Sequence, residues 1–239
     1  APLVLIHDGG GTAFNYHLLG PLERNVFAIS NPHFDSGEPW SGGLPEMAVC
    51  YAKMIEMEVA NGPVIIGGWS LGGMIALELA WQLQKKHSRE VLGIIMLDTP
   101  YPKLYDPIST VTRTEDLDIF SPTTKPTTRT KVRVCMSNAR DMIVSWDLPK
   151  WVASDGIRSK RLPAVFLHAK SYVSAHLSIP GVVAEVDQHR KDPKLGWARY
   201  RHLNFIQVRS IEGNHFSIFA PDLVGELTTH LEDSCTNIE

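Results

Sequence analysis

Short runs of apolar residues recur along the chain, and most of them end at a glycine or a polar residue. A run of this kind, bounded by turn-forming residues, is typical of a strand that is buried on both faces. The first run, LVLIH, is followed directly by the sequence DGGG. We predict strands over Leu3–His7, Asn25–Ser30, Pro63–Gly68, Val91–Asp98, Leu162–Ala169 and His202–Ile211.

Several segments between these runs carry apolar residues at helical spacing. In Glu46–Ala60 and in Met74–Lys86, apolar positions recur every three or four residues, which indicates one buried helical face. The segment Pro221–Asp233 begins with Pro and then Asp, a common start of a helix. Alternation of strands and helices predicts a parallel sheet covered by helices on both faces, and therefore an α/β fold.

The alternation stops after Pro100 and resumes only at the strand expected from Leu162. The stretch Ser121–Thr130, SPTTKPTTRT, is of low complexity, and we expect it to bury little and to be mobile. The stretch Arg133–Val152 has enough apolar residues for one or two helices. We therefore predict a single domain over residues 1–239, interrupted by an insertion at about 101–161.

The most informative motif is GWSLG, at residues 68–72, within the sequence VIIGGWSLGGMIALELA. It matches the pattern G-x-S-x-G, and it stands between a predicted strand and a predicted helix. This context is that of a nucleophile elbow, in which a sharp turn exposes a serine at the start of a helix. Gly68, Gly72 and Gly73 would leave room for the strand and the helix to approach closely. We therefore expect Ser70 to be a catalytic nucleophile.

A serine nucleophile needs a base, and the base needs an acid to orient it. In the α/β-hydrolase fold these residues follow the order Ser, acid, His, with the histidine after the last strand. Only His215 follows the last predicted strand in a turn, within IEGNHFSIF, and we expect it to be the base. Asp98 directly follows a predicted strand and so points off the edge of the sheet where Ser70 is expected. Asp98 is the predicted acid, and Asp187 is the alternative.

The glycine run at residues 9–11 follows the first predicted strand. A phosphate-binding loop would require G-x-G-x-x-G or a terminal GK[ST], and neither is present. An oxyanion hole fits better, because it uses one N–H from an early loop and one from the residue after the nucleophile. We expect the donors to be Leu71 and either Gly9 or Gly10.

Composition limits the class of protein, its partners and its location. Apolar residues make up 44% of the chain and charged residues 21%, as in ordinary globular domains. A net charge of −3 gives no reason to expect nucleic acid or a membrane surface as a partner. The three distant cysteines suggest neither a disulfide framework nor a metal site, and they favour a cytoplasmic location. The abrupt start at Ala1-Pro2 favours a domain excised from a longer protein.

Four motifs in order, IHDGGGTAFNY, GGWSLGG, LDTPYP and GNHF, resemble the thioesterase domains of polyketide synthases and non-ribosomal peptide synthetases. The resemblance is closest to the releasing domains of fungal non-reducing polyketide synthases, and it covers the chain outside roughly 103–160. It implies an α/β-hydrolase fold with a lid in the insertion and no bound cofactor. It also implies an acyl carrier protein as partner, which delivers an acyl chain on its phosphopantetheine thioester.

The resemblance leaves the product open. Release by water gives an acid, release by a hydroxyl of the chain gives a macrolactone or ester, and release by an enol carbon is a Claisen closure. A stand-alone serine esterase and a binding module without chemistry remain alternatives. Trp197 resembles a tryptophan of the family, and we interpret it as a packing residue. The basic residues of the insertion could meet a carrier protein, but a solvated surface is the simpler interpretation; they are Arg113, Lys125, Arg129, Lys131 and Arg133.

Overall fold

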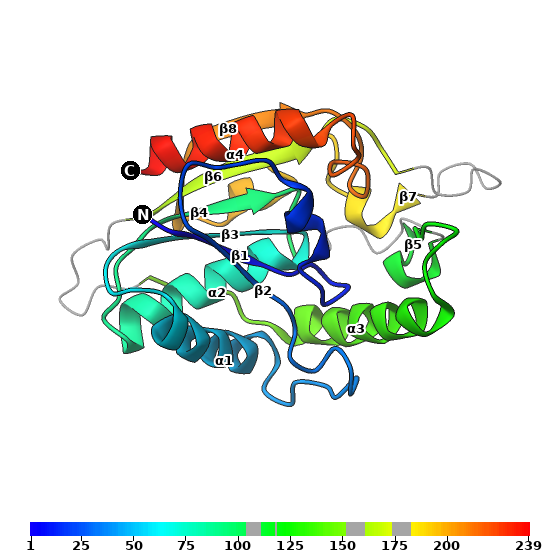
Figure 1. Ribbon diagram of the computed structural model, residues 1–239, viewed down its shortest axis with the longest axis horizontal. Helices are drawn as coiled ribbons and strands as arrows, with labels where there is room; N and C mark the ends of the chain where they lie inside the picture. The colour runs from blue at the N-terminus through cyan, green and yellow to red at the C-terminus, as the bar shows by residue number, and fades with distance from the viewer. Residues whose placement is uncertain (104–110, 118, 152–160, 174–182) are drawn as a thin grey trace.

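A computed structural model of the protein describes residues 1–103, 111–117, 119–151, 161–173 and 183–239 (Figure 1). Its centre is a six-stranded sheet in the order β2-β1-β3-β4-β6-β8, and every neighbouring pair is parallel. The strands predicted from the apolar runs are confirmed, with ends that differ by no more than one residue. They are β1 (Leu3–Ile6), β2 (Val26–Ile29), β3 (Val64–Trp69), β4 (Val91–Leu97), β6 (Leu162–Ala169) and β8 (Leu203–Ile211).

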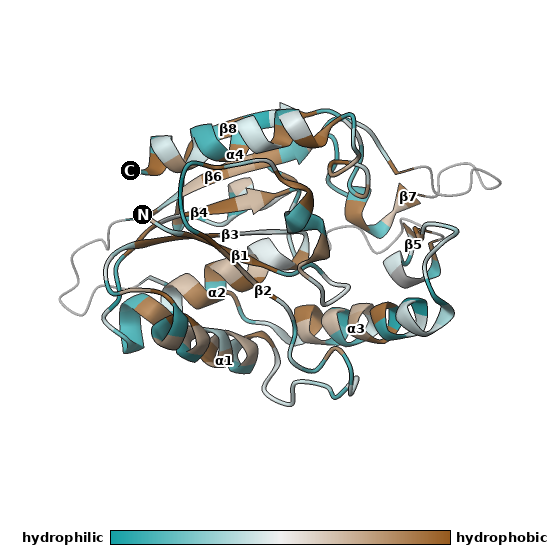
Figure 2. Cartoon of the chain, in the orientation of Figure 1, coloured by the Kyte–Doolittle hydropathy of each residue, from teal (hydrophilic) through white to brown (hydrophobic). Residues whose placement is uncertain are grey.

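Helices cover both faces of this sheet, as the alternating pattern predicts. Helices α1 (Gly43–Glu58) and α2 (Leu71–Lys86) share one core with Val4 and Ile66. Helix α4 (Val224–Ile238) packs on the opposite face, in a second core that includes Leu5 and Ile65. Strands β1, β3 and β4 at the centre of the sheet are strongly apolar, and α1 and α4 carry many polar residues (Figure 2). The α/β prediction is therefore confirmed.

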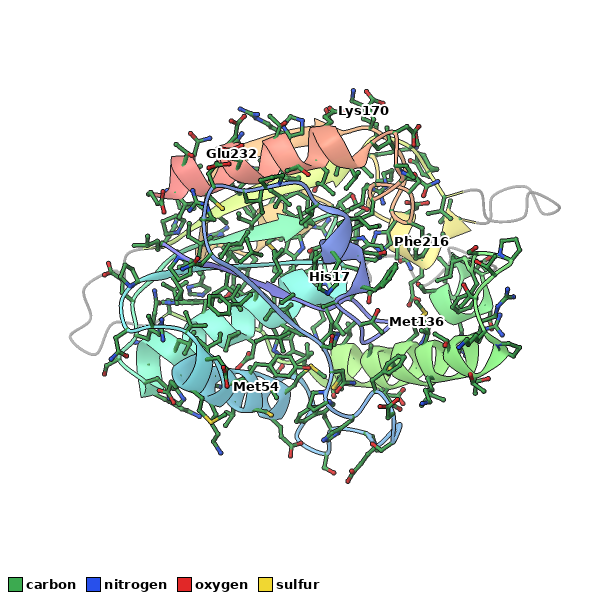
Figure 3. All side chains as sticks on the ribbon, in the orientation of Figure 1. His17, Met54, Met136, Lys170, Phe216 and Glu232 are labelled. Carbon is green, nitrogen blue, oxygen red and sulfur yellow. The ribbon has the colours of Figure 1, made fainter. Side chains whose placement is uncertain are left out.

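Helix α3 (Pro126–Ser145) is the main described element of the predicted insertion. It begins inside the low-complexity stretch, which was not expected to be helical, because Pro126 occupies a first-turn position that tolerates proline. Met136 projects from α3 toward the carboxyl edge of the sheet, on the side where Phe216 lies (Figure 3). Residues 104–110, 118 and 152–160 of the insertion lie outside the described residues.

Short elements complete the described chain. Strands β5 (Val111–Thr112) and β7 (Val183–Ala184) form a separate parallel pair. This pair joins the segment after β4 to the segment after β6, although the two are far apart in sequence. Within the described ranges, no helix combines the length and apolar character that crossing a bilayer requires. The single turns of 3₁₀ helix are η1 (Phe14–Leu18), η2 (Thr114–Asp116), η3 (Glu185–Asp187) and η4 (Trp197–Arg199).

Basic side chains of α3 have partners on the surface of the protein itself. The guanidinium groups of Arg129 and Arg133 lie 5.6 and 5.3 Å from the centroid of the Phe120 ring. The ammonium of Lys131 lies 2.7 Å from a carboxylate oxygen of Asp35. All three side chains thus contact residues of the protein's own surface. Trp197 is fully buried, and its indole N–H donates to the carbonyl of Thr99 at 2.8 Å, which agrees with a packing role.

The start of α2 approaches the strands more closely than any side chain would allow. A Cβ atom added at Gly72 would lie 2.3 Å from the carbonyl oxygen of Ile6. One added at Gly68 would lie 2.4 Å from the carbonyl carbon of Gly72, and one at Gly73 would lie 2.0 Å from Oγ1 of Thr99. The expected reason for these glycines, room for close approach of strand and helix, is confirmed.

We predict that Gly72→Ala destabilises the fold, because its methyl group would force α2 away from β1. Overpacking at such a site costs about 1–3 kcal/mol, which denaturant unfolding measures directly. The matched control is Gly225→Ala in α4, where an added Cβ meets nothing within 4 Å. The control should be neutral or slightly stabilising, since alanine favours a helix more than glycine does. Equal stability of the two variants would contradict the close approach.

Candidate active site

Ser70 lies in the turn between β3 and α2, with φ 57° and ψ −120°. Non-glycine residues seldom adopt a positive φ, and such strain persists only where the surrounding structure enforces it. Here the Ser70 N–H donates to the carbonyl of Leu97 at 2.9 Å, which ties the turn to the end of β4. The hydroxyl therefore stands at the N-terminus of α2, above the carboxyl edge of the sheet.

The structure brings together the three side chains predicted to act in series. Nε2 of His215 lies 3.0 Å from Oγ of Ser70, and Nδ1 lies 2.8 Å from Oδ2 of Asp98. An ionised carboxylate can only accept, so Nδ1 carries the proton and Nε2 is free to accept from the serine hydroxyl. His215 and Asp98 are buried, and their separation in sequence is 117 residues.

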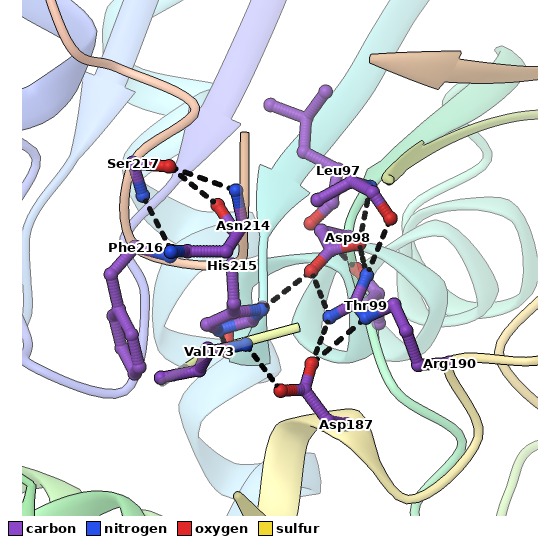
Figure 4. Close-up of polar contacts among 12 residues, drawn as sticks. Leu97, Asp98, Thr99, Val173, Asp187, Arg190, Asn214, His215, Phe216 and Ser217 are labelled. Atoms are coloured by element: carbon purple, nitrogen blue, oxygen red, sulfur yellow. Dashed lines mark hydrogen bonds and ion pairs between the residues drawn. The ribbon is translucent and has the colours of Figure 1, made fainter. Parts of the chain in front are cut away.

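Asp98 directly follows β4, at φ 42°, and both of its carboxylate oxygens are saturated with hydrogen bonds (Figure 4). Oδ1 accepts from the N–H of Ala169 at 2.7 Å and from Nη1 of Arg190. Oδ2 accepts from His215 and from Nη2 of Arg190 at 2.8 Å. Burial alone would raise the pKa of Asp98, but the hydrogen bonds and charges of His215 and Arg190 lower that pKa to about 2.

The alternative acid, Asp187, has different partners. Its Oδ1 accepts from Nε of Arg190 at 2.8 Å, and its Oδ2 accepts from the N–H of Val173 at 2.6 Å. It therefore lies on the far side of Arg190 from Asp98, as Figure 4 shows. Sequence reasoning missed Arg190 altogether. The i,i+3 spacing from Asp187 indicates an ion pair, but it does not indicate that this pair reaches Asp98.

The glycine run forms a tight turn beside Ser70. The N–H of Gly10 donates to Oδ1 of Asp8 at 3.1 Å, and the N–H of Gly11 donates to the Asp8 carbonyl at 3.1 Å. An N–H that already donates to a carboxylate is a poor candidate for an oxyanion donor. Of the two glycines predicted, the geometry therefore favours Gly9, which lines the same cavity as Leu71.

A cavity of about 930 Å³, measured with its open mouth, adjoins Ser70 and His215. Helix α3 contributes Met136 and Ile143 to its wall, and the segment after β6 contributes Val186. A bidentate ion pair between Arg140 of α3 and Glu185 of η3, at 2.7 and 3.1 Å, joins the two segments. The wall opposite the sheet is thus built from both segments, and not from the predicted insertion of 101–161 alone.

The carboxyl group of Asp8, directly before the glycine turn, also lines this cavity. Burial raises the pKa of Asp8 to about 7, although the N–H of Gly10 opposes the shift. Next to it, burial lowers the pKa of His7 to about 4, and Nε2 of His7 lies 2.6 Å from the hydroxyl of Tyr51. Asp8 is therefore an ionisable group that titrates near neutral pH at the edge of the cavity.

Residues 1–235 match the family model described as "Thioesterase domain". The chain belongs to the thioesterase domain family. The family expected from the four motifs is thus confirmed.

Relatives of this thioesterase domain occur both as separate proteins and within a synthetase. It is 34% identical over 241 residues to "Thioesterase AMT4" of Alternaria alternata, covering 100% of this chain and 86% of that one. It is 31% identical over 266 residues to "Nonribosomal peptide synthetase imqB" of Aspergillus flavus, covering 99% of this chain and 8% of the synthetase. The chain therefore corresponds to a small part of that multidomain enzyme.

Solved structures agree with the fold. The NocB thioesterase domain superposes with a TM-score of 0.71 at 22% identity, over 98% of this chain and 93% of that one. The Vlm2 thioesterase domain, solved with a bound dodecadepsipeptide, gives a TM-score of 0.68 at 19% identity, over 98% and 93%. This likeness confirms the expected α/β-hydrolase architecture.

We predict that Asp8→Asn removes part of the pH dependence of stability. The raised pKa means that the folded state holds a proton which the unfolded state releases, so stability is full below about pH 4 and declines up to about pH 7. The variant should match the wild type in acid and exceed it by about 1–2 kcal/mol at about pH 8, because Asp8 is incompletely buried and solvent screens part of the effect. Denaturant unfolding at both pH values, read against exposed Asp222→Asn, checks this. A constant difference across pH would contradict it.

Proposed function

We propose that this thioesterase domain takes an acyl chain from the phosphopantetheine thioester of an acyl carrier protein onto Ser70 and then releases it. The observation that carries the proposal is the series Ser70, His215 and Asp98 at the wall of a largely apolar cavity. The similarity to part of a non-ribosomal peptide synthetase supports a carrier-bound substrate. The proposed chemistry uses no metal and no cofactor bound by the domain.

In the first half-reaction, Nε2 of His215 accepts the proton of the Ser70 hydroxyl while Oγ bonds to the thioester carbonyl carbon. The carbonyl oxygen becomes negative, and we propose that it accepts from the N–H groups of Leu71 and Gly9. The intermediate collapses by breaking the carbon–sulfur bond, and His215 returns the proton to the leaving thiol. Asp98 orients His215 and stabilises its charged form without taking the proton.

In the second half-reaction, His215 removes a proton from the nucleophile that attacks the acyl carbonyl carbon. The bond from that carbon to Oγ of Ser70 then breaks, and His215 returns the proton to Oγ. A hydroxyl of the chain gives a macrolactone or ester, and water gives the free acid; we propose one of these two outcomes. A Claisen closure by an enol carbon uses the same residues, and so does hydrolysis of small esters by a stand-alone esterase. The cavity wall decides among them, because it sets how the chain folds and how much water enters.

We predict that Ser70→Ala abolishes the acyl-enzyme. Wild-type protein incubated with an acyl-pantetheine thioester should gain the mass of one acyl group, and a serine-directed phosphonate should label it. The variant should show neither adduct, because it has no nucleophilic oxygen. An acyl adduct that persists in folded Ser70→Ala protein would show that the nucleophile is another residue.

A matched pair of substrates identifies both the product and the substrate class. A hydroxyl-bearing acyl thioester carried on pantetheine and the corresponding simple oxoester should both be offered to the wild type. The proposed function requires faster turnover of the thioester, with a product one water lighter than the free acid for cyclisation or the free acid itself for hydrolysis. Equal or faster turnover of the oxoester would favour the esterase.

We predict that Gly9→Pro, which removes the N–H, lowers kcat for acylation by about 10²–10³ and changes KM little. Gly9→Ala is the control, because it keeps the N–H and its Cβ would lie 3.9 Å from Met136. Stopped-flow acylation of both variants, with circular dichroism to verify folding, measures the effect. Equal rates for the two folded variants would assign Gly9 a structural role only.

A further inference from the structure

Arg190 is buried between two carboxylates, and one of them is the predicted acid of the site (Figure 4). Its Nη1 and Nη2 both donate to Asp98, and its Nε donates to Asp187. Nη1 also donates to the carbonyl of Ala169 at 3.0 Å. The side chain of Arg190 is 1% exposed, and the carboxylates are 0% exposed. Burying such a charge destabilises the folded state unless hydrogen bonds and opposite charges compensate for the lost solvation.

Arg190 alone would oppose the chemistry proposed above. When His215 takes the proton of Ser70, it becomes a cation on one side of Asp98, while Arg190 is already a cation on the other. One carboxylate between two cations leaves a buried net charge of +1. Asp187, on the far side of Arg190, cancels that charge. With both carboxylates ionised, the cluster changes from −1 to 0 when His215 is protonated.

We propose that Arg190 and Asp187 are positioning residues of the reaction, and that they form with Asp98 and His215 a charge-balanced buried quartet. Arg190 fixes the orientation of the Asp98 carboxylate through two parallel hydrogen bonds. Asp187 offsets the charge of Arg190, so that His215 keeps enough basicity to accept the serine proton. This inference rests on the proposed function for its role in catalysis, but the electrostatic coupling can be measured without turnover.

Other ionisable groups surround the quartet. His168 of β6 interacts with the charges of Asp98, Arg190 and Asp192, and burial lowers its pKa. Burial also lowers the pKa of His189, which lies beside Arg190 in sequence and lines the cavity. Asp8 lines the same cavity from the glycine turn, and Arg140 and Glu185 pair with each other across its wall. A test must therefore observe His215 itself.

The decisive experiment follows the His215 ring by NMR as a function of pH, in the wild type, in Asp187→Asn and in Asp187→Asn/Arg190→Met. Asp187→Asn leaves the charge of Arg190 uncancelled, so the pKa of His215 should fall by about one unit. The double variant removes that positive charge, so the pKa should return to the wild-type value or above it. A second substitution that reverses the first is the signature of charge balance.

The kinetic readout separates charge from orientation. Arg190→Lys keeps the charge but loses the paired hydrogen bonds, so kcat should fall about 10-fold or more while KM and the pKa of His215 stay near the wild-type values. His168→Gln removes the ring signal of His168, so that this signal is not confused with that of His215. Asp8→Asn is the charge control: in its presence, Asp187→Asn should still lower the pKa of His215.

An unchanged pKa of His215 in folded Asp187→Asn, or a further fall in the double variant, would overturn the charge-balanced quartet. Arg190→Lys that retains wild-type kcat would overturn the orienting role of Arg190. Failure of the proposed function gives a different result. A protein without thioesterase activity can still show the fall of the His215 pKa in Asp187→Asn and its return in the double variant. Wild-type activity with unmoved pKa values would remove the quartet and leave the proposed function standing.

Discussion

The close contact between α2 and the strands determines where everything else in the site can lie. Backbone atoms at Gly72 approach the end of β1 to a distance that excludes even a methyl group. Because the helix starts so near the sheet, the chain must turn sharply at Ser70, which adopts a positive φ. The serine hydroxyl is thereby raised above the carboxyl edge, and nearby N–H groups at the start of α2 lack partners in the helix.

The parallel sheet brings residues from distant parts of the sequence together at the site. The carboxyl ends of β3, β4, β6 and β8 lie at one edge, so residues that follow different strands meet there. Asp98 follows β4, and His215 lies in the turn after β8. Because β4 and β8 lie on either side of β6, described residues of the segment between β6 and β8 reach the side of Asp98. Arg190 and Asp187 occupy that position.

The floor and the walls of the cavity come from different parts of the chain. Its floor carries Ser70 and His215, while helix α3 and the segment after β6 form the opposite wall and are joined by the Arg140–Glu185 ion pair. The small sheet of β5 and β7 provides another link between the same two parts of the chain. The residues that would react and the residues that would bound a substrate therefore belong to separate elements.

The sequence by itself predicted the strands, the helices on both faces of the sheet, Ser70 and His215, and it favoured Asp98 over Asp187. Apolar runs, the G-x-S-x-G elbow and the order of motifs are local signals, and local signals can be read without a structure. It did not reveal the start of α3 inside a Thr- and Pro-rich stretch. It also left open the choice between Gly9 and Gly10. That choice depended on the hydrogen bond from Gly10 to Asp8.

Only the tertiary structure decided the partners of Arg190 and the composition of the cavity wall. Arg190 is 92 residues from Asp98 along the chain, and its two hydrogen bonds to that carboxylate exist only because β4 and β6 are neighbours. The pairing of β5 with β7 also joins segments that are far apart in sequence. Contacts of this kind leave no periodicity or motif, because they are fixed by the packing of separate elements and not by neighbouring residues.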